Sequence, residues 1–91
     1  MIEVSTAMHA VRTRLVKLVT EILGSHGTTE HSFPIDQQLS ELGLSSLKMV
    51  NLMLAVEVEF DITIPQSDIT PKNFHSVKTM QSMVERILPS A

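Results

Sequence analysis

The sequence contains no cysteine, which removes several kinds of chemistry at once. The chain can form no disulfide, offers no thiolate nucleophile and cannot build a zinc–cysteine site. Its three glycines are scattered, so neither of the glycine-rich patterns of phosphate-binding loops occurs. The four histidines (His9, His26, His31 and His75) show no metal-ligand spacing, and we expect His26 and His31 to be solvated loop residues. Spacing supports no Ser-His-acid set either. We therefore expect no catalytic residues, no metal site and no enzymatic activity.

Aromatic side chains are also scarce, at 3% of the sequence, with three Phe and no Tyr or Trp. Leu, Ile, Val and the six Met must fill the core, and Met is the residue that adapts best to irregular spaces. Hydrophobic residues make up 43% of the chain, which is ordinary for a globular protein. We expect residues 1–91 to form a single small domain.

Basic residues are too few for a nucleic-acid surface, because the 7 Lys and Arg are outnumbered by 10 Asp and Glu. The net charge of −3 also argues against binding to an anionic membrane. The sequence has no apolar run of about 18 residues that could span a bilayer, and it lacks the features of a signal peptide. We expect a cytoplasmic monomer with no membrane insertion and no nucleic-acid partner.

Apolar residues recur at steps of three and four between residues 4 and 23, which predicts a long amphipathic helix. Its apolar stripe consists of Val4, Met8, Val11, Leu15, Leu18 and Ile22. Gly24 follows, where a helix commonly ends in the left-handed conformation. Residues 24–45 then form a long connection, in which Asp36 could cap a short turn. We expect Leu39 and Leu42 in this connection to be buried across the helices.

A second helix is predicted at about residues 46–60, and it is unusually apolar. A helix of this kind must be covered on most sides, so some of Met49, Met53 and Val58 should meet solvent or a partner. Residues 61–65 are predicted to form an extended loop, because this segment of alternating apolar and polar residues is short and ends in Pro65.

The last part of the chain predicts two further helices. Thr70 and Pro71 are typical of a helix start, and the short third helix would end at about Phe74. Ser76 should cap a last helix, which Pro89 closes. The predicted fold is all-α: a small antiparallel four-helix bundle with three long helices, one short third helix and a long first loop.

Two serines, Ser45 and Ser46, stand at the start of the second helix. Ser is favoured at helix N-caps, because its side-chain oxygen accepts a hydrogen bond from a free backbone N–H. One hydroxyl would then stand exposed at the positive end of a helix, where phosphate is readily held. The pair is therefore either a plain helix cap or a place where a phosphate-linked group is attached.

At this point the chain resembles the acyl carrier protein and peptidyl carrier protein family, over nearly its whole length. Three segments carry the resemblance: Leu39-x-x-Leu42-Gly43-Leu44-x-Ser46-Leu47, Phe60-Asp61-Ile62-Thr63-Ile64-Pro65 and Phe74-His75-Ser76-Val77. They look like the family's attachment motif, its exit from the second helix and its entry to the last one. Each match is short, but their order and spacing together are fairly specific.

The resemblance implies that Ser46 carries a covalent 4′-phosphopantetheine arm, whose thiol holds an acyl or aminoacyl cargo as a thioester. A separate phosphopantetheinyl transferase would install the arm, and it must activate the Ser46 hydroxyl because the chain supplies no neighbouring base. A loading ligase and downstream synthase or transferase enzymes would be the other partners. Leu47 is expected to anchor the helix start in the core and keep Ser46 pointing outward.

Two features depart from the family pattern. Ser45 stands where the family has Asp, so it is the expected N-cap or a neutral stand-in for that carboxylate. The predicted partner surface is mixed in charge and partly apolar, where fatty-acid carriers present acidic residues. It consists of Leu47, Lys48, Met49, Asn51, Glu57 and Val58.

This surface, and the likeness of residues 70–74 to the same segment of aminoacyl carriers, favour a dedicated carrier over a housekeeping fatty-acid carrier. The resemblance implies a role in fatty acid, polyketide or nonribosomal peptide biosynthesis.

Two other functions compete with the carrier interpretation. One is an unmodified helical protein–protein interaction module with a carrier-like fold, and the other is a small DNA-binding domain, which the negative charge disfavours. The sequence does not define the cargo. Met53, Ile64, Ile69 and Phe74 could line a space for an acyl chain, but we expect them to fill the core.

Overall fold

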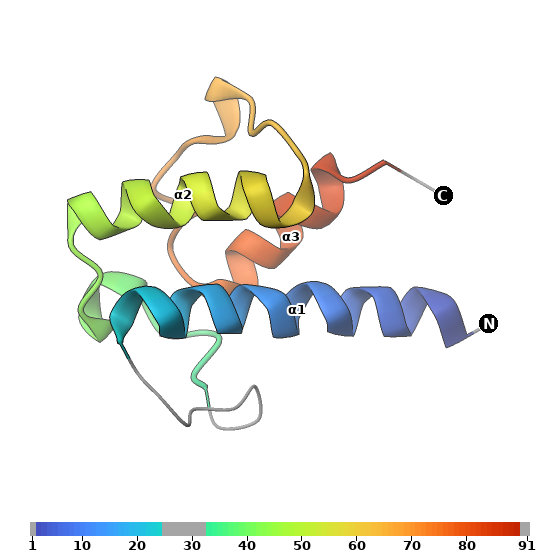
Figure 1. The fold of residues 1–91 in the computed structure, drawn as a ribbon, viewed down its shortest axis with the longest axis horizontal. Helices are drawn as coiled ribbons and strands as arrows, with labels where there is room; N and C mark the ends of the chain where they lie inside the picture. The colour runs from blue at the N-terminus through green and yellow to red at the C-terminus, as the bar shows by residue number, and fades with distance from the viewer. Residues whose placement is uncertain (1, 25–32, 90–91) are drawn as a thin grey trace.

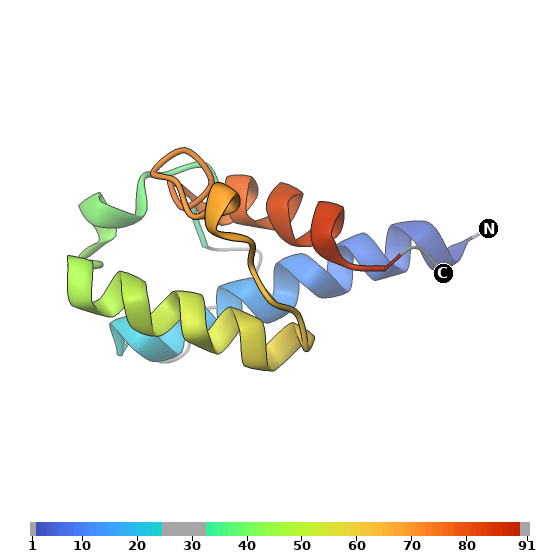
Figure 2. The same cartoon turned by 90° about the horizontal axis from the view of Figure 1, so that it is seen from above.

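The computed structural model describes residues 2–24 and 33–89, with side chains from Ala10 onward. Three α-helices make up its regular structure: α1 (Ile2–Leu23), α2 (Ser46–Phe60) and α3 (Val77–Ile87). The segments between them contain two short 3-10 turns, η1 (Leu39–Leu42) and η2 (Gln66–Asp68). Helices α2 and α3 both run opposite to α1 and pack against it (Figure 1, Figure 2). The expected all-α class is confirmed.

Helix α1 buries one face against the two other helices. Val11, Leu15 and Val19 are almost or fully inaccessible to solvent, and Leu18 and Ile22 pack partly buried beside them. The predicted apolar stripe is therefore correct from Val11 onward, because residues on one face of a helix recur every three or four positions. The side chains of Val4 and Met8 lie outside the described part. Gly24 ends the helix with a left-handed φ of 75°, as the sequence predicted.

The connection before α2 lies across the start of α3. The Leu39 N–H donates to the His75 carbonyl at 2.8 Å, and the Lys78 N–H donates to the Ile35 carbonyl at 3.0 Å. The Leu39 side chain is fully buried, so the expectation that this segment buries its leucines is confirmed for that residue. His26 and His31 lie outside the described residues.

The short turn η1 ends at Gly43, whose φ of 105° is available to glycine but strained for other residues. The expected cap from Asp36 does not form. The residue before the turn is Gln38, which makes no side-chain cap, while Asp36 forms an exposed ion pair with Lys78 at 3.5 Å.

Arg14 on α1 holds the far end of α2. Its Nε donates to Glu59 Oε2 at 2.7 Å, and its guanidinium lies 4.5 Å from the centre of the Phe60 ring. A cation at a helix C-terminus is favourable, because the last carbonyls carry partial negative charge. Asp61 then ends the helix in the left-handed conformation, with a φ of 53°.

The expected short helix at residues 71–74 is replaced by a single turn. The Asn73 N–H donates to Thr70 Oγ1 and the Phe74 N–H donates to the Thr70 carbonyl, so Thr70 does cap a turn as the sequence suggested. The turn cannot extend, because Ser76 must adopt an extended backbone to cap α3. Ser76 and Thr79 form a capping box there, and helix α3 begins and ends where it was predicted.

Leu39 and Leu47 differ in burial. Truncating each side chain should therefore change the free energy of unfolding by a different amount. Leu39 is fully buried, whereas Leu47 is 73% exposed, so the expectation that Leu47 anchors the helix start in the core is wrong. Leu39→Ala should lower the free energy of unfolding by about 2–5 kcal/mol, and Leu47→Ala should change it by at most about 0.5 kcal/mol. Urea denaturation followed by circular dichroism at the helix band measures both. Equal losses in the two variants would contradict this assignment.

Candidate functional site

The two serines at the start of α2 have different structural roles. Ser45 is the N-cap, with an extended backbone and a side-chain oxygen that accepts a hydrogen bond from the Lys48 N–H at 3.3 Å. Ser46 is the first residue of the helix, and its side chain is exposed. The expected N-cap role of Ser45 thus agrees with the geometry. It leaves the Ser46 hydroxyl as the one available for other chemistry at the helix start.

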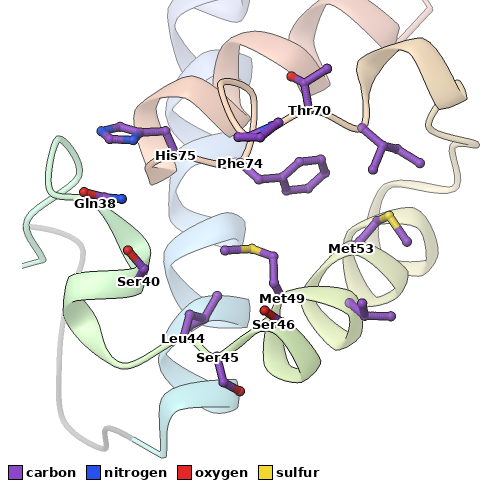
Figure 3. A pocket seen from close by; sticks show the side chains of 13 residues that line it. Gln38, Ser40, Leu44, Ser45, Ser46, Met49, Met53, Thr70, Phe74 and His75 are labelled. Carbon is purple, nitrogen blue, oxygen red and sulfur yellow. The ribbon is translucent and has the colours of Figure 1, made fainter.

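A pocket of about 500 Å³ opens beside Ser46. It lies between the first turns of α2, the end of the connection before α2 and the segment that precedes α3 (Figure 3). Met49 and Met53 line it from α2, and Phe74 faces them from the opposite wall. Polar side chains from two different segments, those of Gln38, Ser40 and His75, stand on another side.

Met53, Ile64, Ile69 and Phe74 were expected to fill the core. This expectation is correct for Ile64 and only partly correct for the others. Ile64 is buried and belongs to the core. Phe74 is buried as well, but it also lines the pocket, as do half-buried Met53 and exposed Ile69. Gln38, Ser40 and His75 were not identified as pocket residues from the sequence, because they are remote from α2 and helical periodicity relates only residues of the same helix.

The wall opposite α2 is fixed by a few polar contacts. Glu57 Oε2 accepts a hydrogen bond from the Ile64 N–H at 2.8 Å, which ties the start of the wall to α2. Further along, Asp68 pairs with Arg86 on α3 at 2.9 Å and its carbonyl accepts from the Asn73 side chain. The pocket is thus bounded by backbone that is held at both ends.

The outer face of α2 carries exposed apolar side chains. Leu47 and Val58 are 73% and 83% exposed, and Val50 and Leu54 are about half exposed. The sequence prediction of a partner surface included Leu47 and Val58 but missed the two residues between them. Val50 lies three residues after Leu47, and Leu54 lies four residues after Val50 and four before Val58, a helical spacing that would have identified both.

Other residues of the predicted surface are distributed differently. Lys48 and Asn51 are exposed on the same helix. Met49 is half buried and points into the pocket, and Glu57 is engaged with the Ile64 N–H. Met49 therefore belongs to the pocket, and Glu57 to the contact between α2 and the loop that follows it.

The first turn of a helix next to an open pocket suits a phosphate-linked group. Backbone N–H groups point out of a helix start, and the helix dipole favours negative charge there. The first turn of α2 contains no acidic residue that would repel a phosphate. The exposed hydroxyl of Ser46 provides a point for covalent attachment, and the adjacent pocket leaves room for a chain that leaves this oxygen. No helix in the described part of the chain is long and apolar enough to cross a membrane.

Comparison with known proteins identifies related sequences. Residues 13–87 match the family described as "Phosphopantetheine attachment site". The chain is 53% identical over 74 residues to "Aminoacyl carrier protein 1" of Bradyrhizobium diazoefficiens, with 81% of each protein covered. It is 36% identical over 73 residues to "Aminoacyl carrier protein" of Agrobacterium fabrum, with 77% of this chain and 88% of the relative covered.

Two solved structures also contain chains that are similar to this one. One match is a chain in the crystal structure of the Bradyrhizobium japonicum glycine:[carrier protein] ligase complexed with glycylated carrier protein. It has a TM-score of 0.65 and 51% identity, and the match covers 80% of this chain and 97% of that one. A second match is to the complex of that ligase with its cognate carrier protein and an analogue of glycyl adenylate. Its TM-score is 0.67 at 50% identity, with 84% and 97% covered.

The capping geometry predicts that alanine substitution lowers stability at Ser45 but not at Ser46. Ser45→Ala removes the hydrogen bond to the Lys48 N–H and should lower the free energy of unfolding by about 0.5–2 kcal/mol. Ser46→Ala should be close to neutral, because the Ser46 hydroxyl does not cap the helix. Ser45→Asp keeps the cap and should match or exceed the parent stability. Thermal unfolding of the unmodified protein measures all three, and a larger loss in Ser46→Ala than in Ser45→Ala would reverse the assignment.

Proposed function

Because the chain belongs to the family defined by the phosphopantetheine attachment site, we propose that Ser46 carries the 4′-phosphopantetheine arm and that the arm holds an aminoacyl cargo. The protein is a non-catalytic carrier, and its cofactor is covalently bound 4′-phosphopantetheine. When attached, the arm supplies the thiol that this cysteine-free chain lacks. The observation that supports Ser46 most directly is its exposed hydroxyl at the first position of α2, beside the pocket.

The residues around Ser46 fit the group. Ser45 satisfies the Lys48 N–H without adding charge, so a phosphodiester on the next residue would have no carboxylate beside it in the first helical turn. The N-terminus of α2 stabilises an exposed anion by about 0.3–1 kcal/mol. A phosphopantetheinyl transferase must activate the hydroxyl, because no basic side chain hydrogen bonds to Ser46 within the described residues.

The likeness to aminoacyl carriers supports an amino acid as the cargo. Relatives named aminoacyl carrier protein cover most of the chain, and a solved relative is bound to a glycine:[carrier protein] ligase. We therefore propose that a ligase of this kind loads the arm and that a downstream transferase removes the aminoacyl group. This proposal narrows the expected acyl or aminoacyl role to an aminoacyl carrier.

Co-expression with a broad-specificity transferase tests the attachment site. The wild-type protein should gain the mass of a single phosphopantetheinyl group, Ser46→Ala should gain none, and Ser45→Ala should be modified because it keeps the nucleophile. Intact-protein mass spectrometry measures the change. If the mass gain persists in Ser46→Ala and disappears in Ser45→Ala, the attachment is on Ser45, and no gain in the wild type would favour an unmodified interaction module.

Loading is tested separately on the modified protein. Incubation with the Bradyrhizobium japonicum glycine:[carrier protein] ligase, glycine and ATP should add one glycyl group, which hydroxylamine should remove as expected for a thioester. The Ser46→Ala protein, treated in the same way, is the control. If the modified protein accepts no amino acid from this or related ligases, the carrier function would still hold. The proposal that its cargo is an amino acid would be wrong.

A further inference from the structure

The pocket beside Ser46 has no negative charge in its lining. None of the described residues that line it is Asp or Glu, and its one titratable side chain is that of His75. The two acidic residues that hold its opposite wall, Glu57 and Asp68, are engaged with a backbone N–H and with Arg86. A positively charged group inside the pocket would therefore have no carboxylate among the described lining residues to pair with.

Hydrogen-bonding side chains gather on one side of the pocket. They are those of Gln38, Ser40 and His75 (Figure 3). The Leu39 N–H donates to the His75 carbonyl at 2.8 Å, and this bond joins the two segments that carry them. None of the three side chains forms a hydrogen bond to another described residue, so their donors and acceptors are available to a ligand. Such groups offset the cost of taking an amide out of water.

The other walls of the pocket are apolar. Met49 lines it beside Ser46, and Met53 lies one turn further along α2. Phe74 faces these two methionines, whose side chains adapt to irregular shapes (Figure 3). The volume of about 500 Å³ is typical of small-molecule sites, which span about 300–1,000 Å³. The pocket therefore suits a slender ligand that is partly apolar and carries neutral amides.

We propose that this pocket holds the neutral middle of the 4′-phosphopantetheine arm and leaves a protonated aminoacyl end in solvent. The proposal rests on the proposed function. Between its phosphate and its thiol the arm carries two amides, a hydroxyl and a pair of methyl groups, which match the polar side at Gln38 and the apolar wall at Met49. Because Ser46 itself lines the pocket, a tethered arm has an effective concentration there of about millimolar, so weak contacts suffice. An ammonium group would lose its hydration without gaining a counter-charge.

NMR of methyl groups locates the arm. Protein labelled with ¹³C at Met and Ile methyls is studied only after its mass shows the arm, so a failure of attachment is recognised before any spectrum is recorded. The methyl signals of Met49 and Met53 should shift on attachment and show nuclear Overhauser contacts with the methyl groups of the arm. Met80 and Met83, fully buried in the core, are internal controls and should not shift. Unshifted Met49 and Met53 signals on a protein that carries the arm would overturn the proposal.

Two cargoes of the same size test the role of charge. In a propionyl group, a methyl replaces the ammonium of a glycyl group. Both are attached from their coenzyme A thioesters by the transferase, so that no ligase is needed. At about pH 6.5, where an α-amino group is protonated, the propionyl methyl should contact the methyl groups of Met53 and Ile69, and the glycyl protons should contact neither. Contacts from both cargoes, or from neither, would overturn the role given to charge.

Gln38→Leu tests the polar side of the pocket. The Gln38 side chain is exposed and caps no helix, so the variant should keep the fold by circular dichroism. In the modified variant the ratio of bound to free arm, measured from the Met49 and Met53 shifts, should fall by about fivefold, as expected for the loss of one hydrogen bond. Gln37→Leu is the matched control, because Gln37 is exposed and does not line the pocket. Equal shifts in the two variants would overturn the role given to Gln38.

Discussion

The position of Ser46, the proposed attachment residue, depends on how Leu39 is held. Its side chain is fully buried, and its N–H donates to the His75 carbonyl just before α3. This hydrogen bond and this buried side chain anchor the connection at Leu39, shortly before α2 begins. From there η1 and Gly43 turn the chain, and the buried side chain of Leu44 directs it into the Ser45 cap. A polar backbone group and an apolar side chain of one residue therefore fix the start of α2 relative to α3.

Helix α2 divides its apolar side chains among the core, the pocket and solvent. Its buried side, with Leu52, Val56 and Phe60, supplies the core, and Met49 and Met53 face the pocket. The remaining side carries the exposed side chains of Leu47, Val50, Leu54 and Val58. Replacing these four exposed side chains by polar ones would cost the fold little, so fold stability does not require them to be apolar.

The sequence predicted the helices well because local signals define them. Serine caps precede α2 and α3, a glycine follows α1, and the apolar spacing gave the buried face of α1 from Val11 onward. Two predictions were wrong for a common reason. Leu47 was expected in the core and residues 71–74 in a helix, but both outcomes depend on tertiary contacts: Leu44 already fills the core at the start of α2, and the Ser76 cap ends the turn begun at Thr70. The pocket depends on residues far apart in sequence, so periodicity could not reveal it.

The neutral cap at Ser45 has a consequence for the modified protein. A carboxylate at this position would stabilise the unmodified helix by about 0.3–1 kcal/mol through the dipole. Once the neighbouring serine carries a phosphodiester, two anions a few ångströms apart would repel each other by about 1 kcal/mol in water, which offsets that gain. A hydroxyl cap provides the hydrogen bond to Lys48 in both states and takes no part in the repulsion. The same residue leaves Lys48 as the only charged residue in the first turn of α2.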